Sequence, residues 1–155
     1  MKITIAAWIG ALMFGWGAGV AYALPPVPEE APAGIKLVAS DDVLKAMEGG
    51  AATLLDSRKQ TDFEGGTIPG SLSCQVSSGD PSVADPEVMA TMEKLAGCEA
   101  LKAADKGKPI ISFCNGVTCW RSLKAALALV KMGFTQVEWY RLGMNDWKEK
   151  GLPTE

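Results

Sequence analysis

The feature that most constrains the fold is an alternation, from residue 35 onward, of short apolar runs with amphipathic stretches. Runs typical of strands cover residues 35–38, 53–56, 109–113 and 136–140, and helices are expected from Ser40 to the Gly49-Gly50 pair, over 59–64 and 86–95, from Ser122 to Gly133, and over 145–150. Strands that alternate with helices on short connections imply a parallel sheet covered on both faces. The class is therefore α/β.

Two further segments are expected to lie outside this alternation. Residues 71–86 are polar and hold both Gly and Pro, which is typical of a long surface loop. Residues 24–34 contain four prolines and two glutamates, which predicts a stiff, solvated linker with nothing to bury. The folded domain is expected to cover residues 35–155.

The first 23 residues carry the signs of an export signal. Lys2 precedes an uncharged, mostly apolar run over residues 3–22, which ends at the small-x-small site Ala21-Tyr22-Ala23. This pattern predicts a secretory signal peptide over 1–23 and a periplasmic or secreted protein. A retained anchor facing the periplasm is the alternative, because about 20 apolar residues can span a membrane. The periplasm is oxidising, so cysteine pairs there can form disulfides.

Composition excludes several kinds of chemistry. The chain has no histidine, which rules out Ser-His and Cys-His catalysis, zinc sites with histidine ligands and CxxCH haem attachment. Fifteen basic and eighteen acidic side chains give a net charge of −3 without a basic cluster, so no nucleic-acid partner is expected. Four cysteines and eighteen carboxylates remain as reactive groups, and the carboxylates are scattered singly, which suggests no acid/base pair. We expect no cofactor and no metal.

The chemistry is expected where strands end, because ligands of such sheets bind beyond the carboxyl ends of the strands. The run 109–113 is followed by Cys114, a loop containing Gly116, then Arg121 and the expected helix start at Ser122. Loop amides, a helix dipole and a guanidinium together favour an anion. The same field would lower the pKa of a cysteine thiol and supply a thiolate nucleophile without histidine.

Three stretches, in order, resemble the rhodanese-like domain family. They are LLDSRKQTDFEGGTIPGSL (54–72), the strand, cysteine loop and helix over 109–134, and LGMNDWKEKGLP (142–153). The resemblance implies a three-layer α/β/α domain around a mainly parallel sheet. It also implies a sulfurtransferase, in which Cys114 takes the outer sulfur of a thiosulfate-like anion as a persulfide and passes it to a thiol or cyanide.

The resemblance further assigns roles around the cysteine. Arg121 and the loop would hold the anionic donor. Asp56 and Arg58 would form an ion pair that either braces the loop or is an ordinary structural pair. The residues expected to bind substrate are Asn115, Gly116, Val117, Thr118, Trp120 and Ser122. The chain also departs from the family pattern: Arg121 lies seven positions after Cys114 rather than five, Thr67 stands where many members have histidine, and Leu142 replaces a common glycine.

The second cysteine of the loop, Cys119, leaves several alternatives open. The loop is similar to exported members with a Cys-Asn-Gly-x-x-Cys pattern, and to a subgroup marked by Cys-Trp. Cys119 could resolve an oxidised or persulfidated Cys114, act as the nucleophile itself, close a loop disulfide, or only pack in the core.

The two other cysteines, Cys74 and Cys98, could form a disulfide or stay as separate thiols. A disulfide closing that segment would contribute roughly 3 kcal/mol. The spacings of 24, 16 and 5 residues between the four cysteines match no pair of zinc knuckles. Trp120, Trp139, Tyr140 and Trp147 could line a pocket mouth, although aromatic residues more commonly lie in the core.

Four functions follow, of which an exported sulfurtransferase is preferred. The alternatives are a thiol–disulfide redox protein using Cys114 and Cys119, a non-catalytic rhodanese-like binding module, and a phosphatase. The expected partners are a small sulfur-containing anion, a thiol or cyanide acceptor and a periplasmic redox partner. A membrane is expected only if the signal is retained.

Overall fold

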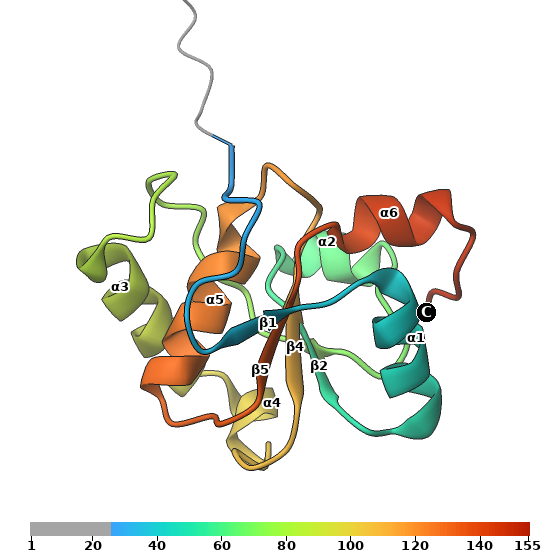
Figure 1. Cartoon of the computed structure of the whole chain (residues 1–155), viewed down its shortest axis with the longest axis horizontal. Coiled ribbons are helices and arrows are strands. Elements are labelled where there is room, and N and C mark those ends of the chain that lie inside the picture. The colour runs from blue at the N-terminus through green and yellow to red at the C-terminus, as the bar shows by residue number, and fades with distance from the viewer. Residues whose placement is uncertain (1–25) are drawn as a thin grey trace, which may run out of the picture.

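The computed structural model describes residues 26–155, in which five parallel strands form one sheet in the order β1-β5-β4-β2-β3 (Figure 1). The strands are β1 (Ile35–Leu37), β2 (Thr53–Asp56), β3 (Leu72–Ser73), β4 (Ile110–Phe113) and β5 (Val137–Tyr140). The α/β class and the parallel sheet expected from the alternation are confirmed.

The expected signal peptide over 1–23 lies outside the described residues. Within residues 26–155, no helix has both the length and the apolar character needed to cross a membrane.

The register brings three strand ends to one edge of the sheet. Asp56 at the end of β2 pairs with Phe113 at the end of β4, and Phe113 pairs with Tyr140 at the end of β5. All four residues of β4 are buried, which explains why its run is apolar except at Ser112, because a central parallel strand is covered on both faces. Residues that follow β2, β4 and β5 therefore lie close together.

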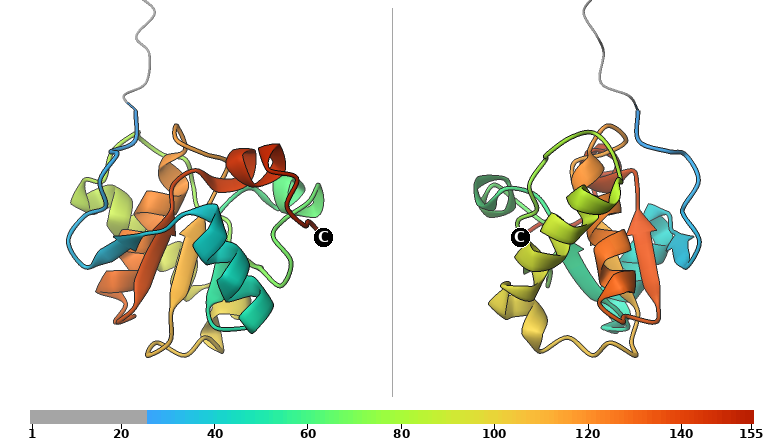
Figure 2. Two further views of the ribbon diagram at one scale, coloured as in Figure 1. Left: turned by 45° about the vertical axis from the view of Figure 1, so that its right-hand side comes forward. Right: turned by 90° about the vertical axis from the view of Figure 1, so that its left-hand side faces the viewer.

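Helices cover both faces of the sheet and produce three layers (Figures 1 and 2). On one face lie α3 (Asp85–Ala96), α4 (Glu99–Lys102) and α5 (Trp120–Lys131), whose apolar side chains share a core with Leu55, Ile110 and Trp139. On the other lie α1 (Ser40–Gly49) and α6 (Gly143–Glu149), which pack with Leu54, Ile111 and Phe113. The short helix α2 (Gln60–Glu64) follows β2.

Several element boundaries differ from those expected. Helix α1 has Ala39 as its N-cap rather than Ser40, and the Asp42 carboxylate accepts a bond from the Ala39 amide (3.1 Å). Helix α5 begins at Trp120 with Cys119 as its N-cap, two residues before the expected start at Ser122. Helix α6 begins at Gly143, also two residues early. Strand β3 and helix α4 were not predicted, because elements of two and four residues are too short to show a period.

The expectation that residues 24–34 have nothing to bury is wrong at Val27. Its side chain is 1% exposed and belongs to the core on the α5 face. The Arg141 guanidinium holds this segment, because its Nε donates to the Pro28 carbonyl (2.8 Å) and its Nη2 to the Val27 carbonyl (3.1 Å). Pro26, Pro28 and Pro32 form neither helix nor strand, but the segment packs on the domain.

The stretch over 71–86 is likewise not a surface loop throughout. Cys74 and Val76 are buried within it. The Val76 amide donates to the Ser57 carbonyl (3.2 Å), which continues the line of strand β3 past the end of β2. Residues 77–80 are exposed, as expected of a loop.

Candidate active site

The turn from β4 to α5 contains a pair of bonded cysteines. Cys114 follows directly after β4 and is fully buried (0% exposed), whereas Cys119 is partly exposed. Their sulfurs are joined in a disulfide with an S–S distance of 2.10 Å and a Cα–Cα distance of 6.4 Å. The loop-disulfide alternative for Cys119 is therefore the state seen in this structure.

The start of α6 fixes the backbone of this turn. The Met144 amide donates to the Cys114 carbonyl (2.8 Å), and the Asn145 amide donates to the Asn115 carbonyl (2.9 Å). Gly143 makes this approach possible, because it has a φ of +57° and a Cβ there would overlap with the Cys114 carbonyl oxygen. The family resemblance directs attention to Leu142, but Gly143 is the residue on which the contact depends.

Tyr140 attaches α6 to the end of β5. Its hydroxyl donates to the Asp146 carboxylate (2.6 Å), and Lys150 also donates to Asp146 (3.1 Å). Burial, followed by the bond to Asp146, raises the pKa of Tyr140 well above its usual value. Burial opposes the charge on Asp146, but the bonds from Tyr140 and Lys150 outweigh it and lower the pKa of that carboxyl. Asp146 thus remains ionised and holds α6 in place.

Arg121 points to Cys119 rather than to Cys114. Its Nε donates to the Val76 carbonyl (3.1 Å), and its Nη1 lies 3.9 Å from the Cys119 sulfur. Because Cys119 is also the N-cap of α5, its sulfur lies at the positive end of a twelve-residue helix. The amide of Cys119 itself is used within the turn, where it donates to the Gly116 carbonyl (2.9 Å).

A pocket of about 350 Å³ opens beside Cys119. It is lined by Asn115, Thr118, Cys119, Trp120 and Arg121 from the turn, and by Ser78, Gly79 and Pro81 from the loop opposite. Three of the predicted substrate-binding residues, Asn115, Thr118 and Trp120, are thus on this pocket.

The other three predicted substrate-binding residues lie outside the pocket lining. Gly116 is buried beside Leu142 and Asn145, and Val117 is exposed at the tip of the turn. Ser122 is buried, with its hydroxyl accepting a bond from the Trp139 indole (3.0 Å). The early start of α5 explains this position, because Ser122 falls in the first turn on the face that packs on the sheet.

Of the four aromatic residues considered for a pocket mouth, Trp120 is on the lining. Trp139, Tyr140 and Trp147 are fully buried in the two cores.

Lys124 is a residue of the site that sequence reasoning missed. Its side chain is 1% exposed, and its ammonium donates to the carbonyls of Ser78 (2.8 Å) and Asp80 (2.6 Å) and to the Glu87 carboxylate. The bond from Lys124 lowers the pKa of Glu87 below its usual value. Lys124 thereby ties residues 77–81, the pocket loop, to α3 and α5. A lysine among the apolar residues of α5 was the sequence signal that could have indicated a buried, bonded ammonium.

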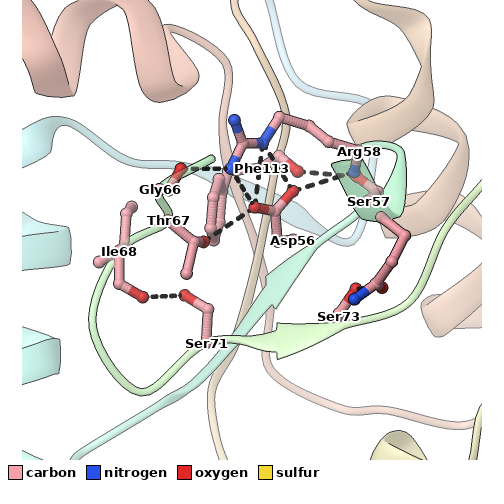
Figure 3. A network of polar contacts seen from close by, with 10 residues as sticks. Asp56, Ser57, Arg58, Gly66, Thr67, Ile68, Ser71, Ser73 and Phe113 are labelled. Atoms are coloured by element: carbon pink, nitrogen blue, oxygen red, sulfur yellow. Dashed lines mark hydrogen bonds and ion pairs between the residues drawn. The ribbon is translucent and has the colours of Figure 1, made fainter. Parts of the chain in front are cut away.

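Asp56 and Arg58 form the expected ion pair, which is fully buried (Figure 3). The guanidinium Nη2 lies 2.6 Å from the Asp56 carboxylate and 2.9 Å from the Gly66 carbonyl, and the Thr67 hydroxyl donates to the same carboxylate (2.8 Å). The pair therefore braces the segment at Gly66 and Thr67 and not the cysteine loop, so it is the ordinary structural pair of the two alternatives. It is Ser57 that contacts the end of β4, since its hydroxyl donates to the Phe113 carbonyl (2.7 Å), one residue before Cys114.

The second disulfide joins Cys74 to Cys98, with an S–S distance of 2.00 Å. It links the segment after β3 to the start of α4. Of the two alternatives for these cysteines, the disulfide is the one seen in this structure. Among residues 26–155, no group of three cysteine, aspartate or glutamate side chains could hold a metal ion.

These features define a class of protein, namely a parallel α/β domain with a cysteine at the end of its central strand and an arginine at the start of the following helix. The chain belongs to the rhodanese-like domain family, whose model matches residues 39–150. No curated protein matches the chain.

Solved structures share this fold at low sequence identity. A thiosulfate sulfurtransferase from Pseudomonas aeruginosa aligns with a TM-score of 0.58 and 22% identity. The alignment covers 78% of this chain but only 20% of the Pseudomonas chain. The human single-domain sulfurtransferase TSTD1 aligns with a TM-score of 0.55 and 24% identity over 74% of this chain and 96% of its own. A rhodanese-related protein from Thermoplasma volcanium aligns with a TM-score of 0.55 and 21% identity over 77% and 97%.

Proposed function

We propose that the chain is an exported sulfurtransferase that carries a sulfane sulfur on Cys114, between a thiosulfate-like donor and a thiophilic acceptor. The observation that carries the proposal is the place of Cys114: it follows the central strand β4 directly, and its carbonyl is fixed by the Met144 amide, in a chain of the rhodanese-like family. Arg121 on the pocket wall supports an anionic donor, which reaches Cys114 only after the disulfide opens, because Cys114 is buried in the bonded state and lies outside the pocket lining.

The proposed reaction begins with the reduced protein. A thiol reductant opens the Cys114–Cys119 disulfide and supplies two electrons and two protons. The Cys114 thiolate then attacks the outer sulfur of thiosulfate, the bond between the two sulfurs of thiosulfate breaks, and sulfite leaves with the electron pair. An acceptor thiolate or cyanide attacks the outer sulfur of the Cys114 persulfide and restores the Cys114 thiolate.

A decisive experiment measures the mass of the reduced protein after exposure to thiosulfate. We expect a gain of one sulfur atom, located on Cys114, followed by thiocyanate formation when cyanide is added. Cys114→Ser should abolish both, while the double variant Cys74→Ser/Cys98→Ser should retain both. Undiminished turnover in Cys114→Ser would remove this residue from the mechanism.

A second candidate function is thiol–disulfide exchange through Cys114 and Cys119. The disulfide between these two cysteines favours this function, because a thiol–disulfide redox protein must adopt both a bonded and a reduced state. If this is the function, cycling the protein between reductant and oxidant changes its mass by two hydrogens in this turn, and thiosulfate adds no sulfur.

Export is proposed from residues 1–23. Expression of the full chain in a bacterial host, followed by N-terminal sequencing of the protein in the periplasm, tests it. A mature protein that begins at Leu24 supports cleavage. An intact N-terminus in the membrane fraction indicates an anchor, and an intact N-terminus in the cytoplasm contradicts export.

A further inference from the structure

The two sulfurs of the Cys114–Cys119 disulfide differ in access. Cys114 is 0% exposed, and its sulfur lies 3.3 Å from the carbonyl oxygen of Cys119. Cys119 is partly exposed and forms part of the pocket wall. Thiol–disulfide exchange requires the attacking thiolate to reach the sulfur that it bonds to. An external thiol that enters the pocket therefore meets Cys119.

The positive charge of Arg121 beside Cys119 favours thiols that carry a negative charge. Arg121 carries the one full charge among the pocket-lining residues of the described chain. Its Nε is held by the Val76 carbonyl, which keeps Nη1 near the Cys119 sulfur. On the opposite wall, the Ser78 carbonyl is already bound by the Lys124 ammonium, which also binds the carbonyl of Asp80 outside the lining. The pocket consequently favours a negatively charged group next to Cys119.

The volume of the pocket can accommodate a small organic molecule. Its volume of about 350 Å³ lies near the lower limit for sites that bind small organic ligands, which is roughly 300 Å³. A thiol with a short carbon chain and a carboxylate meets both the size and the charge requirement.

We propose that Cys119 is a thiolation site at which a small, carboxylate-bearing thiol opens the disulfide. The thiolate of the entering molecule forms a bond with the Cys119 sulfur, the bond between Cys119 and Cys114 breaks, and Cys114 leaves with the electron pair as a thiolate. No other oxidant or reductant takes part, because one disulfide replaces another. A second molecule of the same thiol, as its thiolate, then attacks the small-molecule sulfur of the mixed disulfide; the two small molecules leave as their own disulfide, and Cys119 departs with the electron pair as a thiolate.

This proposal goes beyond sulfur transfer and can be tested without it, because formation of the mixed disulfide needs only the two cysteines and the pocket. In the first experiment, the oxidised full-length protein is mixed with 3-mercaptopropionate, quenched with acid and N-ethylmaleimide, and mapped by non-reducing mass spectrometry. We expect mercaptopropionate on Cys119 and maleimide on Cys114. Mercaptopropionate on Cys114, or exchange confined to the Cys74–Cys98 disulfide, would overturn the proposal.

A second experiment forms the same adduct where it cannot be lost to the neighbouring thiol. Reduced Cys114→Ser and Cys119→Ser, each with the Cys74–Cys98 disulfide intact, react with 3,3′-dithiodipropionate. We expect the adduct on Cys119 to form at least about tenfold faster than that on Cys114, because access controls the rate. Equal rates, a faster reaction at Cys114, or the absence of an adduct on Cys119 in both experiments would contradict the proposal.

The charge requirement is tested by comparing this reagent with cystamine, which carries amines instead of carboxylates. The quantity compared is the ratio of the rate with the carboxylate reagent to the rate with cystamine, both at Cys119. In Cys114→Ser we expect this ratio to be about ten, as electrostatic attraction into a cleft predicts. The ratio cancels any change in the reactivity of the Cys119 thiol itself. Adding Arg121→Gln should bring the ratio close to one, whereas adding Arg121→Lys should preserve most of it.

Arg141→Gln is the matched control, because Arg141 also binds backbone carbonyls but lies outside this pocket lining. Its ratio should equal that of the parent variant. Arg121→Met replaces Arg121→Gln if the latter does not fold, as judged by circular dichroism. A ratio unchanged by loss of the Arg121 charge would rule out the anionic class of thiol.

Discussion

The backbone amide of Met144 donates a 2.8 Å hydrogen bond to the carbonyl oxygen of Cys114. This bond joins the last helix of the chain to the residue that follows the central strand. It depends on the close approach of Gly143, which no residue with a side chain could make in the same place. The position of the candidate nucleophile is therefore set by a segment 29 residues further along the chain.

Gly143→Ala tests this relationship. The added Cβ would overlap with the Cys114 carbonyl oxygen, and the residue would also be strained at a φ of +57°. Gly50→Ala is the matched control, because Gly50 has the same φ and a Cβ there would meet no atom of residues 26–155 within 4 Å. In urea unfolding, we expect Gly50→Ala to lose about 1–2 kcal/mol and Gly143→Ala to lose about 1–3 kcal/mol more. Equal losses would mean that the turn moves without penalty.

Lys124→Met should detach the pocket loop. The substitution leaves the Ser78 and Asp80 carbonyls and the Glu87 carboxylate without the ammonium that binds them. We expect the free energy of unfolding to fall by about 2–3 kcal/mol, as for a buried charged group that loses its partner. Amide hydrogen exchange at residues 77–81 should accelerate as well.

The control for Lys124→Met is Lys131→Met on the same helix. Lys131 is 46% exposed and pairs with the exposed Asp85 at 3.3 Å, so its loss should change stability by less than about 0.5 kcal/mol. Unchanged hydrogen exchange at residues 77–81 in Lys124→Met would show that the loop does not need this anchor.

Stability should fall in acid partly through Glu87. Its pKa is lowered in the folded protein by the bond from Lys124, so the carboxylate binds a proton less readily there than in the unfolded chain. Its contribution is complete above the ordinary glutamate pKa of about 4.3 and is lost as the pH falls through the lowered pKa of the folded state. The free energy of unfolding of the wild type, measured in urea, should therefore fall more steeply with decreasing pH in this window than that of Glu87→Gln. Parallel pH profiles would show that Glu87 contributes nothing.

Cys74→Ala/Cys98→Ala should reduce stability by about 3 kcal/mol, because the disulfide closes a loop with a sequence separation of 24 residues and restricts the unfolded chain. Thermal unfolding in the absence of reductant measures the loss. The same double substitution should leave the reactivity of Cys119 unchanged, because neither cysteine lines the pocket beside it. A stability equal to that of the wild type would indicate that this disulfide is not formed in solution.

The sequence predicted the sheet and the place of its chemistry for clear physical reasons. The run over 109–113 is apolar at nearly every position because β4 is covered on both faces, and a parallel sheet exposes its ligand edge where such strands end. The cysteine loop and the buried Asp56–Arg58 pair were thus located from local pattern and family resemblance. Elements without a period, such as β3 and α4, left no comparable signal.

What the sequence determined by itself is the order of strands and helices, the absence of histidine chemistry and the cysteine at the end of β4, because each of these is written in neighbouring residues. The tertiary structure alone decided that Arg121 faces Cys119, that Lys124 binds the pocket loop and that α6 holds the Cys114 carbonyl. These contacts join segments that lie far apart in the chain, or depend on where a helix begins. Their geometry follows from how the layers pack, which residue spacing does not record.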